Sequence, residues 1–193
     1  TLDTATNANT NTAATTSSFV YDNTAPAAAV SIPATGTHYN SAGWNSTLTG
    51  TSVDTTGGSG TTATISIQKD GGASACWDGT DAAGHFTTAC PNYVAVTGGT
   101  AAGSATANWT KTLSSGSLVD GSSYVLTVKT LDTATNANTN TAATTSTFVY
   151  DTTAPAAAVS IPATGTHYNS AGWNPTLTGT SSDSGGANAS GTT

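Results

Sequence analysis

The feature that most constrains this chain is an internal repeat with a spacing of 129 residues. Residues 1–54 return as residues 130–183, and only four of the 54 positions differ: Ser18/Thr147, Asn23/Thr152, Ser46/Pro175 and Val53/Ser182. Self-similarity at a fixed spacing is the signature of a tandem array in which each repeat is one structural unit. A repeat of 129 residues is too long for a helical or leucine-rich repeat and suits a β-sandwich with an insertion. We therefore expect these residues to be a slice of a longer array.

Two proline segments mark the predicted boundaries between units. Pro26 and Pro155 end the sequences YDNTAP and YDTTAP. Proline cannot extend a preceding strand ladder, and it keeps the residue before it in extended geometry. The predicted units are residues 1–22, the C-terminal strand or strands of one repeat; residues 23–151, a complete repeat; and residues 152–193, the start of the next.

Composition favours β-sheet domains with small hydrophobic cores and argues against several functional classes. With three basic residues against ten acidic ones, the chain has no basic surface for nucleic-acid phosphates. No apolar run approaches the ~20 residues that a membrane-spanning helix needs. Short runs of alternating apolar and polar residues recur between turn residues, as in residues 63–70 and 118–132. Such runs predict an all-β fold of about seven strands, typical of a sandwich.

The segment from residue 118 to residue 136 reads LVDGSSYVLTVKTLDTATN. It resembles the sixth strand of bacterial immunoglobulin-like repeats, in which a D-G-x-x-Y turn introduces the strand and a D-x-x-x-N loop follows it. Residues 151–155 match the D-T-T-A-P boundary of that family, and residues 66–79 resemble its S-I-Q…W-D-G segment. The resemblance covers nearly all of residues 23–151. It implies immunoglobulin-like β-sandwich modules in tandem, as in the extracellular stalks of adhesins and other surface proteins.

Three details of this match bear on the structure. Thr135 stands where the family usually has glycine, and the cysteine-bounded loop has the character of an insertion. Tyr124 is the tyrosine of the D-G-x-x-Y motif. Its hydroxyl is expected to close the turn after Asp120-Gly121, as a tyrosine corner does; an ordinary half-buried strand tyrosine is the alternative.

Cys76 and Cys90 are the only cysteines. In a threonine-rich chain of secreted type, such a pair favours a disulfide. Closing a loop of roughly 15 residues would contribute about 3 kcal/mol through the entropy of the unfolded chain. A metal site made with His85 is the poorer alternative, because it offers at most three ligands at no recognised zinc spacing.

The loop between the cysteines holds the densest group of polar and aromatic residues in the chain. Trp77, Asp78 and Phe86 are candidate ligand-binding residues, with a carbohydrate as the ligand. The alternative is that the loop is a surface insertion that the cysteine pair closes and that binds no ligand.

Aspartate and asparagine gather at the ends of the predicted modules. Calcium takes six to eight oxygen ligands in flexible geometry, which suits carboxylates and amide carbonyls that meet at a junction. The family resemblance adds that calcium stiffens many such junctions; local turn formation is the alternative reason for these residues. The candidate ligands are Asp132, Asn136, Asn138 and Asp151, with Asp3, Asn7, Asn9 and Asp22 at the earlier junction, and Asp54 and Asp183 recur in the same pattern.

No constellation of residues suggests catalysis. The chain has no glutamate, no G-x-S-x-G elbow and no H-E-x-x-H motif, so we do not expect an enzyme. We expect a structural spacer or stalk module in a long, secreted bacterial surface protein or extracellular filament that supports adhesion or assembly. The alternative is a carbohydrate- or surface-binding module acting through the Cys76–Cys90 loop. The expected partners are neighbouring repeats, identical chains in a filament or sheath, and glycans.

Overall fold

The computed structural model describes residues 16–54, 60–99, 106–134, 139 and 143–184. In this part of the chain the regular structure consists of β-strands and one 3₁₀ turn, so the all-β prediction is confirmed. The first strands are β1 (Ala27–Ile32), β2 (Thr37–Tyr39), β3 (Thr47–Val53), β4 (Thr61–Lys69), β5 (Cys76–Trp77), β6 (Phe86–Thr88), β7 (Val94–Ala95) and β8 (Thr97–Gly98). They are followed by β9 (Thr106–Thr112), the 3₁₀ turn η1 (Ser115–Ser117), β10 (Ser122–Asp132), β11 (Thr144–Tyr150), β12 (Ala156–Ile161) and β13 (Thr178–Ser182).

The smaller of the two main sheets has the strand order β1-β3-β9-β8. All of its pairings are antiparallel. Gly50 lies at the centre of this sheet, opposite Val30 on β1 and Trp109 on β9. Every second residue of β3 is buried, which is the period expected of a strand with one face on the core.

The larger sheet has the order β2-β11-β10-β4-β5-β6, with β7 also paired to β4. Its central strand, β10, pairs antiparallel with β4 and β11, and its residues alternate strictly between buried and half-buried. The pairing of β11 with β2 is parallel, so these two strands run in the same direction.

Aromatic rings fill much of the core. Buried residues of both sheets contribute to it. The ring of Phe148 stacks between Trp44, at a centroid distance of 4.9 Å, and Tyr124, at 5.0 Å. Tyr39 and Phe86 meet this stack at an angle. Each aromatic side chain buries a large area. A chain that is poor in large aliphatic residues thus still builds a continuous core.

Tyr124 closes the turn before β10, as the sequence predicts. The backbone N–H of Val119 donates a hydrogen bond to the Tyr124 hydroxyl over 2.8 Å. Burial of the phenol raises the pKa of Tyr124 to about 12, so it stays protonated at neutral pH. The same arrangement recurs where Ala34 donates to the hydroxyl of Tyr39 and Ala163 donates to that of Tyr168.

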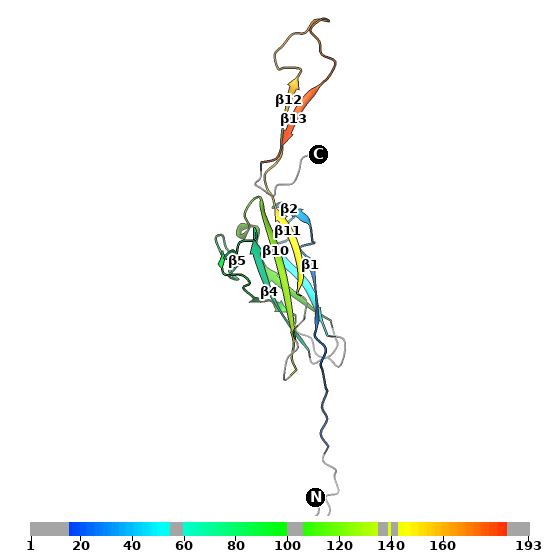
Figure 1. The fold of residues 1–193 in the computed structure, drawn as a ribbon, viewed down its shortest axis with the longest axis vertical. Helices are drawn as coiled ribbons and strands as arrows, with labels where there is room; N and C mark the ends of the chain where they lie inside the picture. Colours follow the sequence, from blue (N-terminus) through cyan, green and yellow to red (C-terminus); the bar gives the residue numbers. More distant parts are fainter. Residues whose placement is uncertain (1–15, 55–59, 100–105, 135–138, 140–142, 185–193) are drawn as a thin grey trace, which may run out of the picture.

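The chain passes from one end of the two-sheet unit to the other. Figure 1 shows residues 16–26, which form no strand, extending from one end, while β12 and β13 project beyond the opposite end. The β12–β13 hairpin repeats the β1–β3 pair in its residue pairing, since Val159 opposes Gly179 as Val30 opposes Gly50.

We predict that Gly50→Ala destabilises the protein by about 3 kcal/mol or more, the upper range for an overpacked core. A methyl group at Gly50 would overlap the carbonyl oxygen of Ala29 and the indole ring of Trp109. Gly116→Ala is the matched control, because the nearest atom to a methyl group there is the Ser114 hydroxyl at 3.8 Å. Denaturant unfolding of the full chain measures both. Equal stability of the two variants would contradict the close packing of Trp109 on Gly50.

Candidate functional site

Three aspartates from distant parts of the sequence meet at one end of the two-sheet unit. Carboxylate oxygens of Asp22, Asp54 and Asp132 all lie within 4.8 Å of one another. Asp54 is fully buried, Asp132 is 3% exposed and Asp22 is half-buried. This aspartate cluster is the only group of three or more such ligands that the described residues bring together.

Strand pairing brings the three carboxylates together. Asp54 follows β3, whose last residue pairs with Ala27 at the start of β1, and this places it near the segment that carries Asp22. Asp132 is the last residue of β10, and it pairs with Thr61 at the start of β4. A hydrogen bond of 3.1 Å from the Thr130 hydroxyl to the Pro26 carbonyl holds the end of β10 against the incoming chain.

Two of the three aspartates also form local turns. Oδ1 of Asp22 accepts a hydrogen bond from the Thr24 backbone N–H at 3.0 Å, and Oδ1 of Asp132 accepts one from Ala134 at 3.1 Å. Turn formation, the alternative explanation for these residues, is therefore present. It does not exclude cation binding, because a carboxylate oxygen that accepts a hydrogen bond has another lone pair for a cation.

The electrostatics of the cluster favour a bound cation. Carboxylates this close repel one another, and burial adds a desolvation cost to each charged form. Hydrogen bonds, protons or a bound cation can each offset this cost. Three carboxylates provide up to six hard oxygen ligands, which is a donor set that fits calcium.

The other predicted ligands are distributed differently. Asp3, Asn7, Asn9, Asn136 and Asn138 lie outside the residues that the structure describes. Asp151 lies at the opposite end of the unit from Asp132, because β11 ends beside the start of β10. There Asp151 is 6% exposed, and its backbone N–H donates to the Tyr39 carbonyl at 2.8 Å. By the 129-residue offset, Asp151 and Asp183 are the copies of Asp22 and Asp54.

Cys76 and Cys90 form a disulfide, as predicted, with their Cα atoms 5.2 Å apart. Cys76 is buried in β5, where it pairs with Gln68 of β4 and Thr88 of β6. The bridge thus fixes the insertion to the edge of the larger sheet.

The two aromatic residues that the sequence offers as ligand contacts lie in the core. Trp77 is 1% exposed, and its indole N–H donates to the Thr80 carbonyl at 2.7 Å. Phe86 is 8% exposed and packs against the ring of Tyr124 at a centroid distance of 5.3 Å. Both rings therefore anchor the loop in this structure and offer little surface to a ligand.

Asp78, the third of these residues, takes part in the hydrogen bonding of the loop. One of its oxygens lies 2.6 Å from Nδ1 of His85, and the other accepts a hydrogen bond from the Thr80 backbone at 2.8 Å. The hydrogen bond with His85, followed by that from Thr80, holds the pKa of Asp78 below its ordinary value of 3.8.

Asp81 fixes the loop to the main body, a role that sequence reasoning missed. Its Oδ1 accepts hydrogen bonds from the backbone N–H of Ser114 at 2.7 Å, the Ser114 hydroxyl at 2.9 Å and the Ser117 hydroxyl at 2.6 Å. Partial burial raises the pKa of Asp81, but the bonds from Ser117 and Ser114 outweigh it and leave the pKa below 3.8. No local sequence signal predicts this contact, since the partners lie 33 and 36 residues away.

Comparison of the chain with protein-family models, with curated proteins and with solved structures gives no significant match. Among the described residues, no helix is long and apolar enough to cross a membrane.

We predict that Cys76→Ala with Cys90→Ala lowers the free energy of unfolding by about 3 kcal/mol, the loop-entropy value for a closed loop of this size. Urea unfolding with and without a reductant measures the effect. The reductant should destabilise the natural chain and leave the double variant unchanged. A natural chain that is insensitive to reductant would contradict a stabilising role for the bridge.

Proposed function

We propose that this chain is part of a structural spacer. Its units would be immunoglobulin-like β-sandwich modules joined in tandem, in a long secreted bacterial surface protein or extracellular filament. The observation that carries the proposal is the combination of 54 near-identical residues repeated at a spacing of 129 with chain connections at opposite ends of the two-sheet unit. Units joined in this way add length in one direction, and an array can grow by duplication without a new type of junction.

The path of the chain supports this proposal. The segment before β1 runs past the aspartate cluster at one end. At the other end, Tyr150 pairs with Ser122 and the chain leaves towards β12. The disulfide supports the secreted location, because stable disulfides form mainly in oxidising compartments.

Hydrogen bonds anchor the linker that leaves the unit. Asp120 accepts a hydrogen bond from the Thr152 backbone N–H at 2.5 Å and another from the Thr153 hydroxyl at 2.6 Å. The bond from Thr152, followed by that from Thr153, lowers the pKa of Asp120 below 3.8. Charge-assisted bonds of this kind limit how far the next unit can swing.

The second part of the proposal is that calcium binds the aspartate cluster. Asp22 belongs to the segment before β1, whereas Asp54 and Asp132 belong to the unit itself. A cation held by all three would fix the preceding segment to the unit. Its positive charge would reduce the repulsion between the three carboxylates.

The alternative function, carbohydrate or surface binding through the Cys76–Cys90 loop, has less support. A sugar-binding surface usually presents an aromatic ring, and Trp77 and Phe86 are both buried. A test at exposed positions is more informative than Trp77→Ala, which would disturb the core. Glycan binding by the natural chain that disappears in His85→Ala would favour this alternative over the spacer.

We predict that calcium stabilises the full chain, by about 2.7 kcal/mol when its concentration is a hundred times the dissociation constant. Asp54→Asn should remove this effect and should be at least as stable as the natural chain in EDTA, because it relieves repulsion between carboxylates. Thermal unfolding in calcium and in EDTA measures both results. Asp78→Asn, which removes a carboxylate outside the cluster, is the control and should keep the response. An identical calcium response in the natural chain and Asp54→Asn would contradict the site.

We predict that Asp120→Ala widens the range of orientations between the main unit and the β12–β13 hairpin. Small-angle X-ray scattering of the full chain measures this as a broader distribution of interatomic distances. A carboxyl group whose pKa is lowered on folding contributes above its unfolded pKa and loses this contribution as the pH falls through the folded value. The natural chain should therefore resemble Asp120→Ala only below pH 3.8. Asp78→Ala is the matched control, and a natural chain as flexible as Asp120→Ala at neutral pH would count against a stiff spacer.

A further inference from the structure

The segment that enters the unit, residues 26–39, belongs to both sheets. Its first part is β1, which pairs antiparallel with β3 in the smaller sheet. Its second part is β2, which pairs parallel with β11 in the larger sheet. Pro33, which is buried, lies between these two strands. Because the chain leaves the unit from β11, the incoming and the outgoing segments are neighbours (Figure 1).

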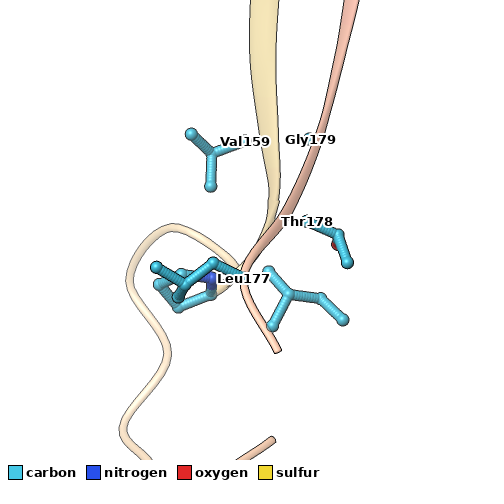
Figure 2. A pocket seen from close by; sticks show the side chains of 6 residues that line it. Val159, Leu177, Thr178 and Gly179 are labelled. Carbon is cyan, nitrogen blue, oxygen red and sulfur yellow. The ribbon is translucent and has the colours of Figure 1, made fainter. Parts of the chain in front are cut away.

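The pairing of β1 with β3 is local in the sequence, and it recurs one repeat later. Figure 2 shows Val159 of β12 beside Gly179 of β13, the counterparts of Val30 and Gly50. The contact of the incoming segment with β10 and β11 is of a different kind, because it joins residues 104 to 116 positions apart. It ties the start of the unit to its end.

Side-chain hydroxyls make the first part of this long-range contact. Three of them donate to carbonyl oxygens of the incoming segment: Thr130 to Pro26 at 3.1 Å, Thr144 to Ala28 at 2.9 Å and Ser146 to Pro33 at 2.7 Å. Thr130 is fully buried and Ser146 is 2% exposed. Water therefore has little access to either bond.

Backbone hydrogen bonds continue the contact as far as the exit. The N–H of Gly36 donates to the Thr147 carbonyl at 2.7 Å, and β2 then pairs with the last three residues of β11. The N–H of Asp151 donates to the Tyr39 carbonyl at 2.8 Å. The incoming segment is thus bonded at successive positions along the whole length of β11.

The parallel direction of the two segments decides how this contact carries a load. Tension along an array pulls the incoming segment at the end of the unit where β11 begins, and it pulls β11 at the end where β11 finishes. The two segments would have to slide past each other, which strains all the hydrogen bonds between them together, because these bonds run across the strands. Neighbouring segments pulled apart at a common end would instead separate one bond at a time.

We propose that residues 26–39 and β11 form a mechanical latch that sets the force at which the unit opens. The bonds of Thr144 and Ser146 carry part of the load, together with the parallel ladder between β2 and β11. The role of the latch rests on the proposed spacer function, because tension reaches it in an array that is pulled at both ends. The latch itself belongs to a single unit and is tested there.

The first test pulls the full chain by its two termini at constant force, in EDTA so that calcium does not contribute. Ser146→Ala removes a hydroxyl that donates to the Pro33 carbonyl and accepts from the Thr35 hydroxyl at 3.1 Å. We expect this variant to open about fivefold faster than the natural chain, or more, as for the loss of one hydrogen bond that holds the latch.

Ser52→Ala is the matched control. Ser52 is fully buried like Ser146, and its hydroxyl also has two partners, the Thr61 hydroxyl at 2.9 Å and the Gly99 carbonyl at 3.0 Å. These bonds lie outside the latch. Both variants should lose stability in urea without load, but only Ser146→Ala should open faster under force. An unchanged rate for Ser146→Ala, or an equal acceleration in Ser52→Ala, would overturn the proposal.

The second test changes the direction of pull and leaves the latch residues in place. Ser41 and Thr152 are exposed and follow β2 and β11 at the same end of the unit. Handles attached to these two side chains would peel β11 away bond by bond. At the same force the unit should then open about tenfold faster than when it is pulled by its termini, because the bonds no longer share the load. Equal rates for the two directions would overturn the latch.

The disulfide identifies the opening of the unit in these recordings. With Cys76–Cys90 reduced, the released length should grow by about 50 Å, for 14 further residues at roughly 3.5 Å each. A release that stays the same with the reductant would place the opening outside the unit and would count against the latch. A unit that opens easily, together with a narrow distance distribution in small-angle scattering, would remove the latch and leave the spacer proposal standing.

Discussion

The stack of Trp44, Phe148 and Tyr124 is the contact on which the rest of the unit depends. The three rings come from segments far apart in the sequence, and Phe148 lies between the other two. Aromatic area replaces the aliphatic area that this chain lacks, so a core forms with few large aliphatic residues. The Tyr168–Trp173 pair repeats the Tyr39–Trp44 contact in the hairpin, with centroids 5.4 Å apart against 5.2 Å.

Around this core, several polar groups act at the ends of the unit. The aspartate cluster lies where the chain reaches the unit, and Asp120 holds the linker where the chain leaves it. The disulfide and Asp81 both secure the insertion at the side. These contacts at the junctions and at the inserted loop are consistent with the proposed role of a spacer.

Sequence reasoning reached the all-β class, the disulfide and the turn closed by Tyr124, because each has a local signal: strand alternation, an isolated cysteine pair, or the D-G-x-x-Y motif. It placed Asp132 and Asp151 in one predicted calcium site, although they lie at opposite ends of the unit. The distance between them depends on the antiparallel pairing of β11 with β10, which the sequence does not show. It also did not foresee that Trp77 and Phe86 are buried. The sequence of a loop does not show whether an aromatic side chain in it faces solvent or the core.

The sequence by itself determined the repeat, and with it the equivalence of Gly50 with Gly179 and of Asp22 with Asp151. The identity of residues in a repeat is a property of the chain, and it holds in any fold. Only the tertiary structure decided which distant residues these positions contact. Trp109 covers Gly50, and Asp54 joins Asp22 and Asp132 because β3 and β10 end at the same place. Such contacts depend on strand pairing between distant residues, and no local pattern in the sequence encodes that pairing.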